Sequence, residues 1–172
     1  ERTQGYVFIE EAADANLDAF LEILKIAGAS FEQKENGIRF FSTGELKATD
    51  VTTAIYPGVM TDWQAPWAVL MTQAVGTSTV HETVFEDKLG FAQDLKRMGA
   101  DITLFNPSVA DPEAIYNFNL ADDDPLYFHA VKIQGLTPLH NAVLKTLDIR
   151  AGAAMVLDAL IAKGETPIHG VY

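Results

Sequence analysis

The feature that most constrains the fold of this chain is an internal repeat. Under an offset of 71 positions identical residues recur along one stretch: Gly5/Gly76, Glu11/Glu82, Phe20/Phe91, Leu24/Leu95, Lys25/Lys96, Gly28/Gly99 and Ala29/Ala100. A second offset, of 88 positions, matches another set: Ala65/Ala153, Ala74/Ala162, Gly76/Gly164, Val80/Ile168 and His81/His169. A repeat on this scale predicts similar supersecondary units packed side by side. The larger second offset also indicates an insertion.

Hydrophobic periodicity predicts the elements of these units. Strands are expected at 6–12, 51–57, 77–85 and 101–105, helices at 17–27, 62–75 and 89–98, and a hairpin turning at Asn36-Gly37. The alternation predicts an α/β fold of repeated βαβαββ units, at about 1–50, 51–135 and 136–172, with helices packed inward and sheets outward.

Two segments depart from the regular pattern. Residues 106–130 are rich in Pro, Asn and Asp, which predicts an irregular solvated insertion away from any cleft, with a short strand near 116–120. Residues 150–164 are apolar almost all round, which predicts a helix buried on several sides. The first unit starts and the last unit stops part-way through the pattern, so we expect a domain truncated at both ends.

Charge and composition exclude several classes of function. The 172 residues carry 12 basic and 24 acidic side chains, a net charge of -12, which argues against nucleic acid and anionic membrane surfaces as partners. No apolar run approaches the ~20 residues of a membrane-spanning helix. The absence of cysteine excludes disulfides and thiolate sites and fits a cytoplasmic protein.

Candidate site residues gather where expected strands give way to helices. Asp62 stands at the start of a helix, where a helix cap is the simpler explanation. Glu82, Glu86, Asp87 and Lys88 follow a strand, and an exposed ion pair would explain the lysine. Asp148 and Arg150 stand at the mouth of the last helix, where a helix cap would also explain Asp148. A cation there is unfavourable for the helix dipole and therefore indicates an anionic ligand.

No recognised metal or nucleotide motif accompanies these residues. The four histidines have no zinc-ligand spacing, and the run Asp122-Asp123-Asp124 lacks the alternating ligands of a calcium loop. Phosphate-binding glycine loops and nucleophile elbows are also absent. From residue types alone we expect an α/β repeat domain with an anion-binding cleft, no metal and no cofactor.

Three segments nevertheless resemble one enzyme family. They are PGVMTDWQAPW (57–67), VGTSTVHETVFEDKLGFAQDLKRMGADI (75–102) and LDIRAGAAMVLDALIAKGETPIHGVY (147–172). Their order and spacing are similar to those of the UDP-N-acetylglucosamine 1-carboxyvinyltransferases, members of the enolpyruvyl transferases. The resemblance implies two lobes of three βαβαββ units each, and this chain as most of one lobe. It implies no cofactor.

The resemblance also implies an activity and a site. The family transfers enolpyruvyl from phosphoenolpyruvate to the 3-hydroxyl of UDP-N-acetylglucosamine, a step in peptidoglycan precursor synthesis, in a cleft closed by the second lobe. Asp62 matches the base, Thr61 and Val84 border the sugar nucleotide, and Asp148 and Arg150 match a D-x-R at the cleft. Lys88 stands where the family usually has Arg, which keeps the charge but loses the bidentate fork.

Alternatives remain open from the sequence. The sister enzyme that acts on shikimate 3-phosphate shares the fold, although its segments resemble these less. A non-catalytic binding domain could also reuse the repeat. In either enzyme, we expect this chain to be inactive without the second lobe, because the cleft needs both.

Overall fold

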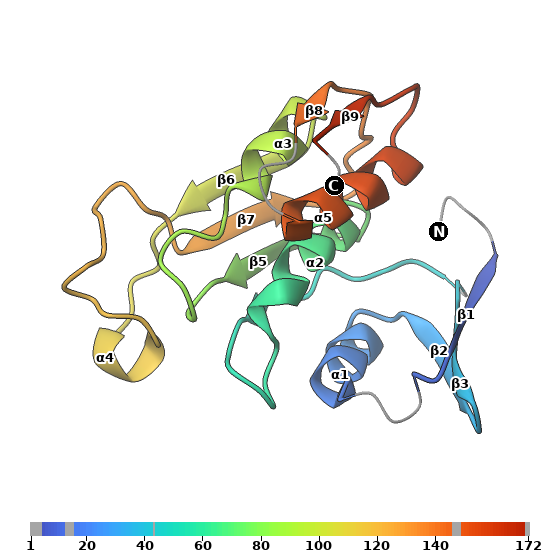
Figure 1. The fold of residues 1–172 in the computed structure, drawn as a ribbon, viewed down its shortest axis with the longest axis horizontal. Helices are drawn as coiled ribbons and strands as arrows, with labels where there is room; N and C mark the ends of the chain where they lie inside the picture. The colour runs from blue at the N-terminus through green and yellow to red at the C-terminus, as the bar shows by residue number, and fades with distance from the viewer. Residues whose placement is uncertain (1–4, 13–15, 43, 146–148, 171–172) are drawn as a thin grey trace.

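The computed structural model describes residues 5–12, 16–42, 44–145 and 149–170 of the 172-residue chain. Within these ranges the strands form three sheets, with orders β1-β3-β2, β4-β5-β7-β6 and β8-β9. The sheets lie toward the outside of the molecule, and helices α2 and α5 lie between them (Figure 1). No helix in the described ranges is long and apolar enough to cross a bilayer.

The middle sheet contains one complete βαβαββ unit. Its elements in chain order are β4 (Val51–Thr52), α2 (Gln64–Met71), β5 (Thr77–His81), α3 (Phe91–Arg97), β6 (Asp101–Phe105) and β7 (Ala130–Gln134). Strand β4 pairs with β5 in parallel, and β7 lies antiparallel between β5 and β6. The α/β fold of repeated units with inward helices, expected from the sequence, is confirmed.

The first sheet repeats the second half of that unit. Its elements are β1 (Tyr6–Glu10), α1 (Asp18–Ile26), β2 (Ser30–Lys34) and β3 (Gly37–Phe41). Strand β3 lies antiparallel between β1 and β2, as β7 lies between β5 and β6. The register is also equivalent, since Phe41 pairs with Tyr6 and Ser30 as Gln134 pairs with Thr77 and Asp101. The 71-residue offset is therefore a repeat of backbone geometry.

The last elements repeat the first half of the complete unit. Strands β8 (Leu144–Lys145) and β9 (Ile168–His169) are parallel and enclose α5 (Ile149–Ile161), as β4 and β5 enclose α2. Glycines at matching positions end the helical stretches, with φ of +81° at Gly28 and +91° at Gly99, and of +110° at Gly76 and +99° at Gly164. Positive φ is a conformation that glycine adopts without steric cost.

The core is centred on α2, whose side chains are buried on most sides. Trp67 is buried and its indole Nε1 donates to the carbonyl of Thr49 at 3.3 Å. Helix α5 packs on α2, and its Ala154 and Met155 are buried, but one face of the helix is open, whereas the sequence predicts a helix buried on several sides. Its Val156, Leu157 and Leu160 are exposed, because no described element packs over that face.

The remaining differences from the predicted elements concern element ends and one predicted strand. Strand β4 stops at Thr52, not at residue 57. Strand β5 stops at His81, not at residue 85, and α2 stops at Met71, where the Thr72 hydroxyl donates to the Val69 carbonyl. The strand predicted near 116–120 is wrong. Residues 106–129 instead contain the short helix α4 (Pro112–Ile115), capped by the Asp111 carboxylate.

Candidate functional site

The predicted site lies beyond the carboxyl ends of two neighbouring parallel strands. The chain leaving β4 leads to the 3₁₀ helix η1 (Thr61–Trp63) and then directly into α2, while the chain leaving β5 forms the turn 82–85. In α/β sheets this edge is where ligands bind, because backbone ends and helix N-termini converge there. The sequence predicted site residues on both segments, Thr61 and Asp62 on one and Val84 and Lys88 on the other.

Asp62 is an exposed carboxylate in the middle of η1. It is not the cap residue of either helix, because Met60 precedes η1 and Trp63 precedes α2. The cap that could have explained Asp62 from the sequence is therefore not its role.

Glu82 joins the two segments. Its side chain is 1% exposed, and its Oε2 accepts from the Thr61 hydroxyl at 2.7 Å. Its Oε1 accepts from the backbone N–H of Val84 at 2.7 Å and of Phe85 at 3.0 Å. The sequence singled out Glu82 only as one of several acids near a helix start. The matched pair Glu11/Glu82 marks its place in the repeat but gives no sign of its burial.

Thr61 is held from a second side as well. Gln64, which is buried, donates from Nε2 to the Thr61 hydroxyl oxygen at 3.1 Å. The Thr61 hydroxyl therefore both donates and accepts inside the protein. The Val84 N–H is likewise occupied by Glu82, which leaves the carbonyl and the isopropyl group of Val84 to contact a ligand.

Lys88 lies four residues after Val84, in the connection between β5 and α3. Its Nζ is 5.3 Å from the centroid of the Phe85 ring, and the Phe85 side chain is exposed. A cation over an aromatic face is a weak, adaptable contact. Lys88 can thus point its charge toward an anion at this edge without breaking a buried interaction.

The segment 106–129 supports the turn from the opposite side. Asn117 donates its backbone N–H to the Thr83 carbonyl at 2.7 Å, and the Tyr116 hydroxyl lies 3.2 Å from His81 Nε2. Thr83 is also held by Thr53, whose hydroxyl accepts from the Thr83 N–H at 2.8 Å. Tyr116 and Asn117 of the insertion pack on the end of β5 and on the residue before Val84. The place of the insertion relative to the cleft stays a prediction.

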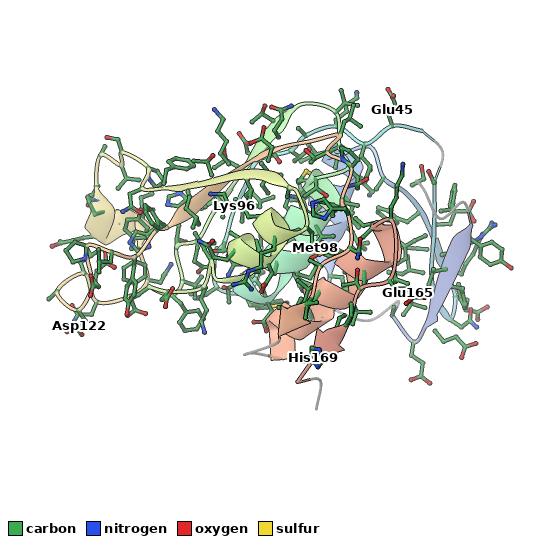
Figure 2. The ribbon with its side chains drawn as sticks, turned by 90° about the horizontal axis from the view of Figure 1, so that it is seen from above. Glu45, Lys96, Met98, Asp122, Glu165 and His169 are labelled. Atoms are coloured by element: carbon green, nitrogen blue, oxygen red, sulfur yellow. The ribbon has the colours of Figure 1, made fainter. Side chains whose placement is uncertain are left out.

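Burial shifts the pKa values of His81 and Tyr116, which meet where the insertion contacts β5. Burial, and next the charge of His129, lower the pKa of His81 below its ordinary value. Burial, and next the charge of Asp123, raise the pKa of Tyr116. Asp123 is 2.9 Å from His129 Nε2, so one carboxylate of the acidic run turns inward. Asp122 lies at the far tip of the insertion, across α3 from Glu165 (Figure 2), and is exposed as predicted.

The remaining predicted residues are not placed in full. Asp148 lies outside the described residues, and so does the side chain of Arg150, whose backbone is in the first turn of α5. An open pocket of about 410 Å³ lies elsewhere, beside α1 and the first sheet, and is lined by Leu24, Phe40 and Leu70 among others. The described part of the chain has no cluster of His, Cys, Asp or Glu suited to a metal ion.

Comparison with known proteins gives a consistent set of relatives. The family model of EPSP synthase (3-phosphoshikimate 1-carboxyvinyltransferase) matches residues 3–172. UDP-N-acetylglucosamine 1-carboxyvinyltransferase of Protochlamydia amoebophila is 39% identical over 98% of this chain and 35% of its own length. The enzyme of the same name from Chlamydia muridarum is 41% identical over 94% of this chain and 36% of its own length. The chain thus spans about a third of the relatives it matches.

Solved structures share the fold. The enolpyruvyl transferase NikO from Streptomyces tendae has a TM-score of 0.74 at 23% identity and covers 96% of this chain, which corresponds to 34% of that protein. EPSP synthase from Acinetobacter baumannii has a TM-score of 0.59 at 16% identity, over 96% of this chain and 35% of its own. At these identities the likeness concerns the fold alone.

Proposed function

The chain belongs to the EPSP synthase (3-phosphoshikimate 1-carboxyvinyltransferase) family, and from this premise we propose that it supplies the acceptor-activating side of an enolpyruvyl transferase acting on UDP-N-acetylglucosamine. The choice of acceptor is supported by relatives of 39% and 41% identity that carry that name. The single structural observation behind the assignment is the meeting of η1 and the turn 82–85 through Glu82.

The proposed reaction has two stages. The oxygen of the sugar 3-hydroxyl attacks C2 of phosphoenolpyruvate while its proton leaves and C3 gains a proton, which gives a tetrahedral phosphate ketal. The bond from C2 to the phosphate oxygen then breaks and C3 loses a proton. Inorganic phosphate is released, and the product is an enolpyruvyl ether of the sugar. A base, an acid and cations are needed to carry out these steps.

Asp62 is the proposed base for the 3-hydroxyl proton. An exposed carboxylate in the first turn of a helical stretch is accessible to a substrate hydroxyl. Val84 is the proposed contact of the sugar nucleotide, through its carbonyl and side chain. Thr61, whose hydroxyl is occupied on both sides, is proposed to border the pocket and not to bind the substrate through that hydroxyl.

Cations are proposed to bind the carboxylate and phosphate of the second substrate. Lys88 is one such group, and Arg150, in the first turn of α5, is the other. Asp148 is proposed to orient these cations. An arginine can bind a carboxylate or phosphate with two parallel hydrogen bonds, whereas a lysine offers a point charge. The acid that protonates C3 is expected on the second lobe, which closes the cleft.

The setting of the reaction is part of the same proposal. The product would be a precursor of peptidoglycan, and the nucleotide sugar and phosphoenolpyruvate would be supplied in the cytoplasm. The second lobe is the proposed partner of this chain, and without it we expect no turnover. No nucleic acid or membrane partner is proposed, because the net charge of -12 repels phosphate-rich surfaces.

Transfer to shikimate 3-phosphate is the second candidate, favoured by the description of the matching family. Both candidates are tested by measuring phosphate release from phosphoenolpyruvate by the full-length protein that contains these residues. We expect release with UDP-N-acetylglucosamine and none with shikimate 3-phosphate, with this 172-residue chain as an inactive control. Release with shikimate 3-phosphate alone would mean that this compound is the acceptor. Release with neither compound would contradict the proposed function.

A further inference from the structure

Glu82 is a buried carboxylate to which the proposed reaction gives no role. It is 1% exposed, and no Lys, Arg or His nitrogen of the described residues lies within 4.0 Å of it. Burying an ionised carboxylate without a countercharge costs several kcal/mol unless hydrogen bonds replace its hydration. Glu82 accepts three, from the hydroxyl of Thr61 and from the backbone N–H groups of Val84 and Phe85.

The two carboxylate oxygens have separate duties. Oε1 organises the local turn by accepting from Val84 and Phe85, which a shorter polar side chain also does in many turns. Oε2 reaches across to η1 and accepts from Thr61, 21 positions earlier in the chain. Local turn formation does not need this second contact. Its effect is to fix the segment that carries the proposed base relative to the segment that carries the proposed nucleotide contact.

The contact is built on both sides to hold a single geometry. Gln64 donates to the Thr61 hydroxyl oxygen at 3.1 Å, so the only proton of that hydroxyl is directed to Glu82. The next residue, Thr83, is fixed by Thr53 on one side and by Asn117 on the other. Buried networks in which each donor has a defined acceptor are rigid, and a small displacement at either end is transmitted to the other.

We propose that Glu82 is a positioning residue for the transfer reaction: through Thr61 it sets the place of the Asp62 carboxylate relative to the sugar-nucleotide contact at Val84. The inference rests on the proposed function and extends it, since Glu82 touches neither substrate nor the reacting atoms. Displacing a base by about 1 Å from the oxygen it deprotonates can cost on the order of a hundredfold in rate. The loss is expected mainly in kcat, with a smaller rise in the KM of the sugar nucleotide.

The test is a double-mutant cycle in the full-length protein with Thr61→Val and Glu82→Gln. Valine keeps the shape of the Thr61 side chain but lacks the hydroxyl group that donates to Glu82. Glutamine keeps an acceptor for Val84 and Phe85 but presents an NH₂ group or a weaker acceptor to Thr61. Each single variant is expected to lower kcat at least tenfold, and the double variant to be no worse than the worse single one. Thr61→Ser, which keeps the hydroxyl, is expected to restore activity.

The matched control is Thr77→Val. Thr77 also donates its hydroxyl to a side-chain oxygen, that of Gln134 at 2.6 Å, but on the exposed face at the other end of β5. It is expected to leave kcat within twofold. If Thr61→Val and Glu82→Gln also stay within twofold in an active enzyme, the positioning role is wrong while the proposed function stands.

A second readout separates the two proposals. Hydrogen exchange of the Val84 and Phe85 amides, measured by NMR on the 172-residue chain, should become faster in Thr61→Val than in Thr77→Val. Faster exchange in a protein whose full-length form releases no phosphate would support the coupling and contradict the proposed function. Unchanged exchange at both amides would overturn the coupling itself, whatever the activity.

Discussion

Glu11 and Glu82 occupy the same place in two copies of one structural unit, at the end of β1 and of β5. In both copies the backbone N–H of the glutamate donates to the connection before the central strand of its sheet, to Asn36 at 2.8 Å and to His129 at 2.7 Å. The side chains differ completely. The Glu11 side chain is exposed, and the backbone φ of this residue is 59°. The Glu82 side chain is buried and accepts three hydrogen bonds.

The two copies show that the repeat supplies a scaffold and that the connections supply the site. Between β2 and β3 the chain needs only Glu35 and Asn36, but between β6 and β7 it runs through residues 106–129. That longer connection brings Tyr116 and Asn117 onto the end of β5. A fold can thus keep strand order and register in both copies while one copy alone acquires a buried polar network.

The largest expected effect comes from Asp62, whose counterpart under the 88-residue offset is Arg150. Asp62→Asn in the full-length protein should lower turnover roughly a hundredfold or more, because the amide cannot accept the hydroxyl proton. Asp18→Asn, a change of the acid in the first turn of α1, serves as the matched control. Unchanged turnover in Asp62→Asn, with the melting temperature preserved in both variants, would rule out the base assignment.

The second effect concerns Asp158 on α5. Under the 88-residue offset its counterpart on α2 is Leu70, so a buried acid replaces a leucine between the two copies. Asp158 is 2% exposed, and burial, and next the charge of Asp94, raise its pKa to about 7. Because the folded-state pKa lies above that of the unfolded chain, this group makes stability fall as pH rises from about 4 to about 7.

Asp158→Asn removes that dependence. At pH 8 the variant should be more stable than the original chain by about 4 kcal/mol, the free-energy equivalent of a pKa shift from 3.8 to about 7, and near pH 4 the two should be equal. Denaturant unfolding of both chains at a series of pH values checks this. If the free energies of unfolding of the two chains differ by the same amount at every pH, Asp158 does not cause the pH dependence.

The third effect comes from shortening the connection between β6 and β7. Residues 106–129 are replaced with the two-residue turn Glu-Asn that joins β2 and β3. The sheet should persist, because the register of β6 with β7 equals that of β2 with β3. Turnover of the full-length protein should fall about tenfold, since Thr83 and His81 lose Asn117 and Tyr116 and the turn carrying Val84 loosens. Turnover equal to that of the original protein would show that the insertion does not support the site.

The smallest effect compares Gly28 with Gly99, which end α1 and α3. Each Gly→Ala change should destabilise by about 1 to 2 kcal/mol, because φ is +81° and +91°. A Cβ at Gly99 would also lie 2.8 Å from the His140 ring, whereas at Gly28 it would lie 3.6 Å from the Glu45 carbonyl. Gly99→Ala should therefore be the more destabilised by about 1 kcal/mol in thermal unfolding. Equal losses would contradict the tighter packing at Gly99.

Much of the fold follows from residues whose effect is local. Gly28 and Gly99, both at positive φ, follow α1 and α3 where the sequence predicts these helices to end, and the strand at 101–105 and the βαβαββ order are confirmed. The predicted ends at residues 75 and 85 are wrong because side chains take over backbone partners. Thr72 bonds the Val69 carbonyl, and Glu82 captures the N–H groups of Val84 and Phe85.

The site is harder to predict because it depends on contacts between distant segments. Position along the chain points to Asp62 and Lys88, and the family resemblance adds Thr61 and Val84. Nothing in their spacing reveals that Glu82 joins the two segments. Helix α4 did leave a signal, an Asp111 cap followed by Pro112 in the first turn. The packing of Tyr116 on His81 left none, because it depends on where the insertion folds back.

The most direct test of the central claim, that one copy of the unit carries the site, is a paired measurement of phosphate release. Glu82→Gln and Glu11→Gln are the same chemical change at equivalent positions of the full-length protein, assayed with phosphoenolpyruvate and UDP-N-acetylglucosamine. We expect at least a tenfold loss of kcat for Glu82→Gln and less than a twofold change for Glu11→Gln. Equal effects of the two changes would contradict that claim.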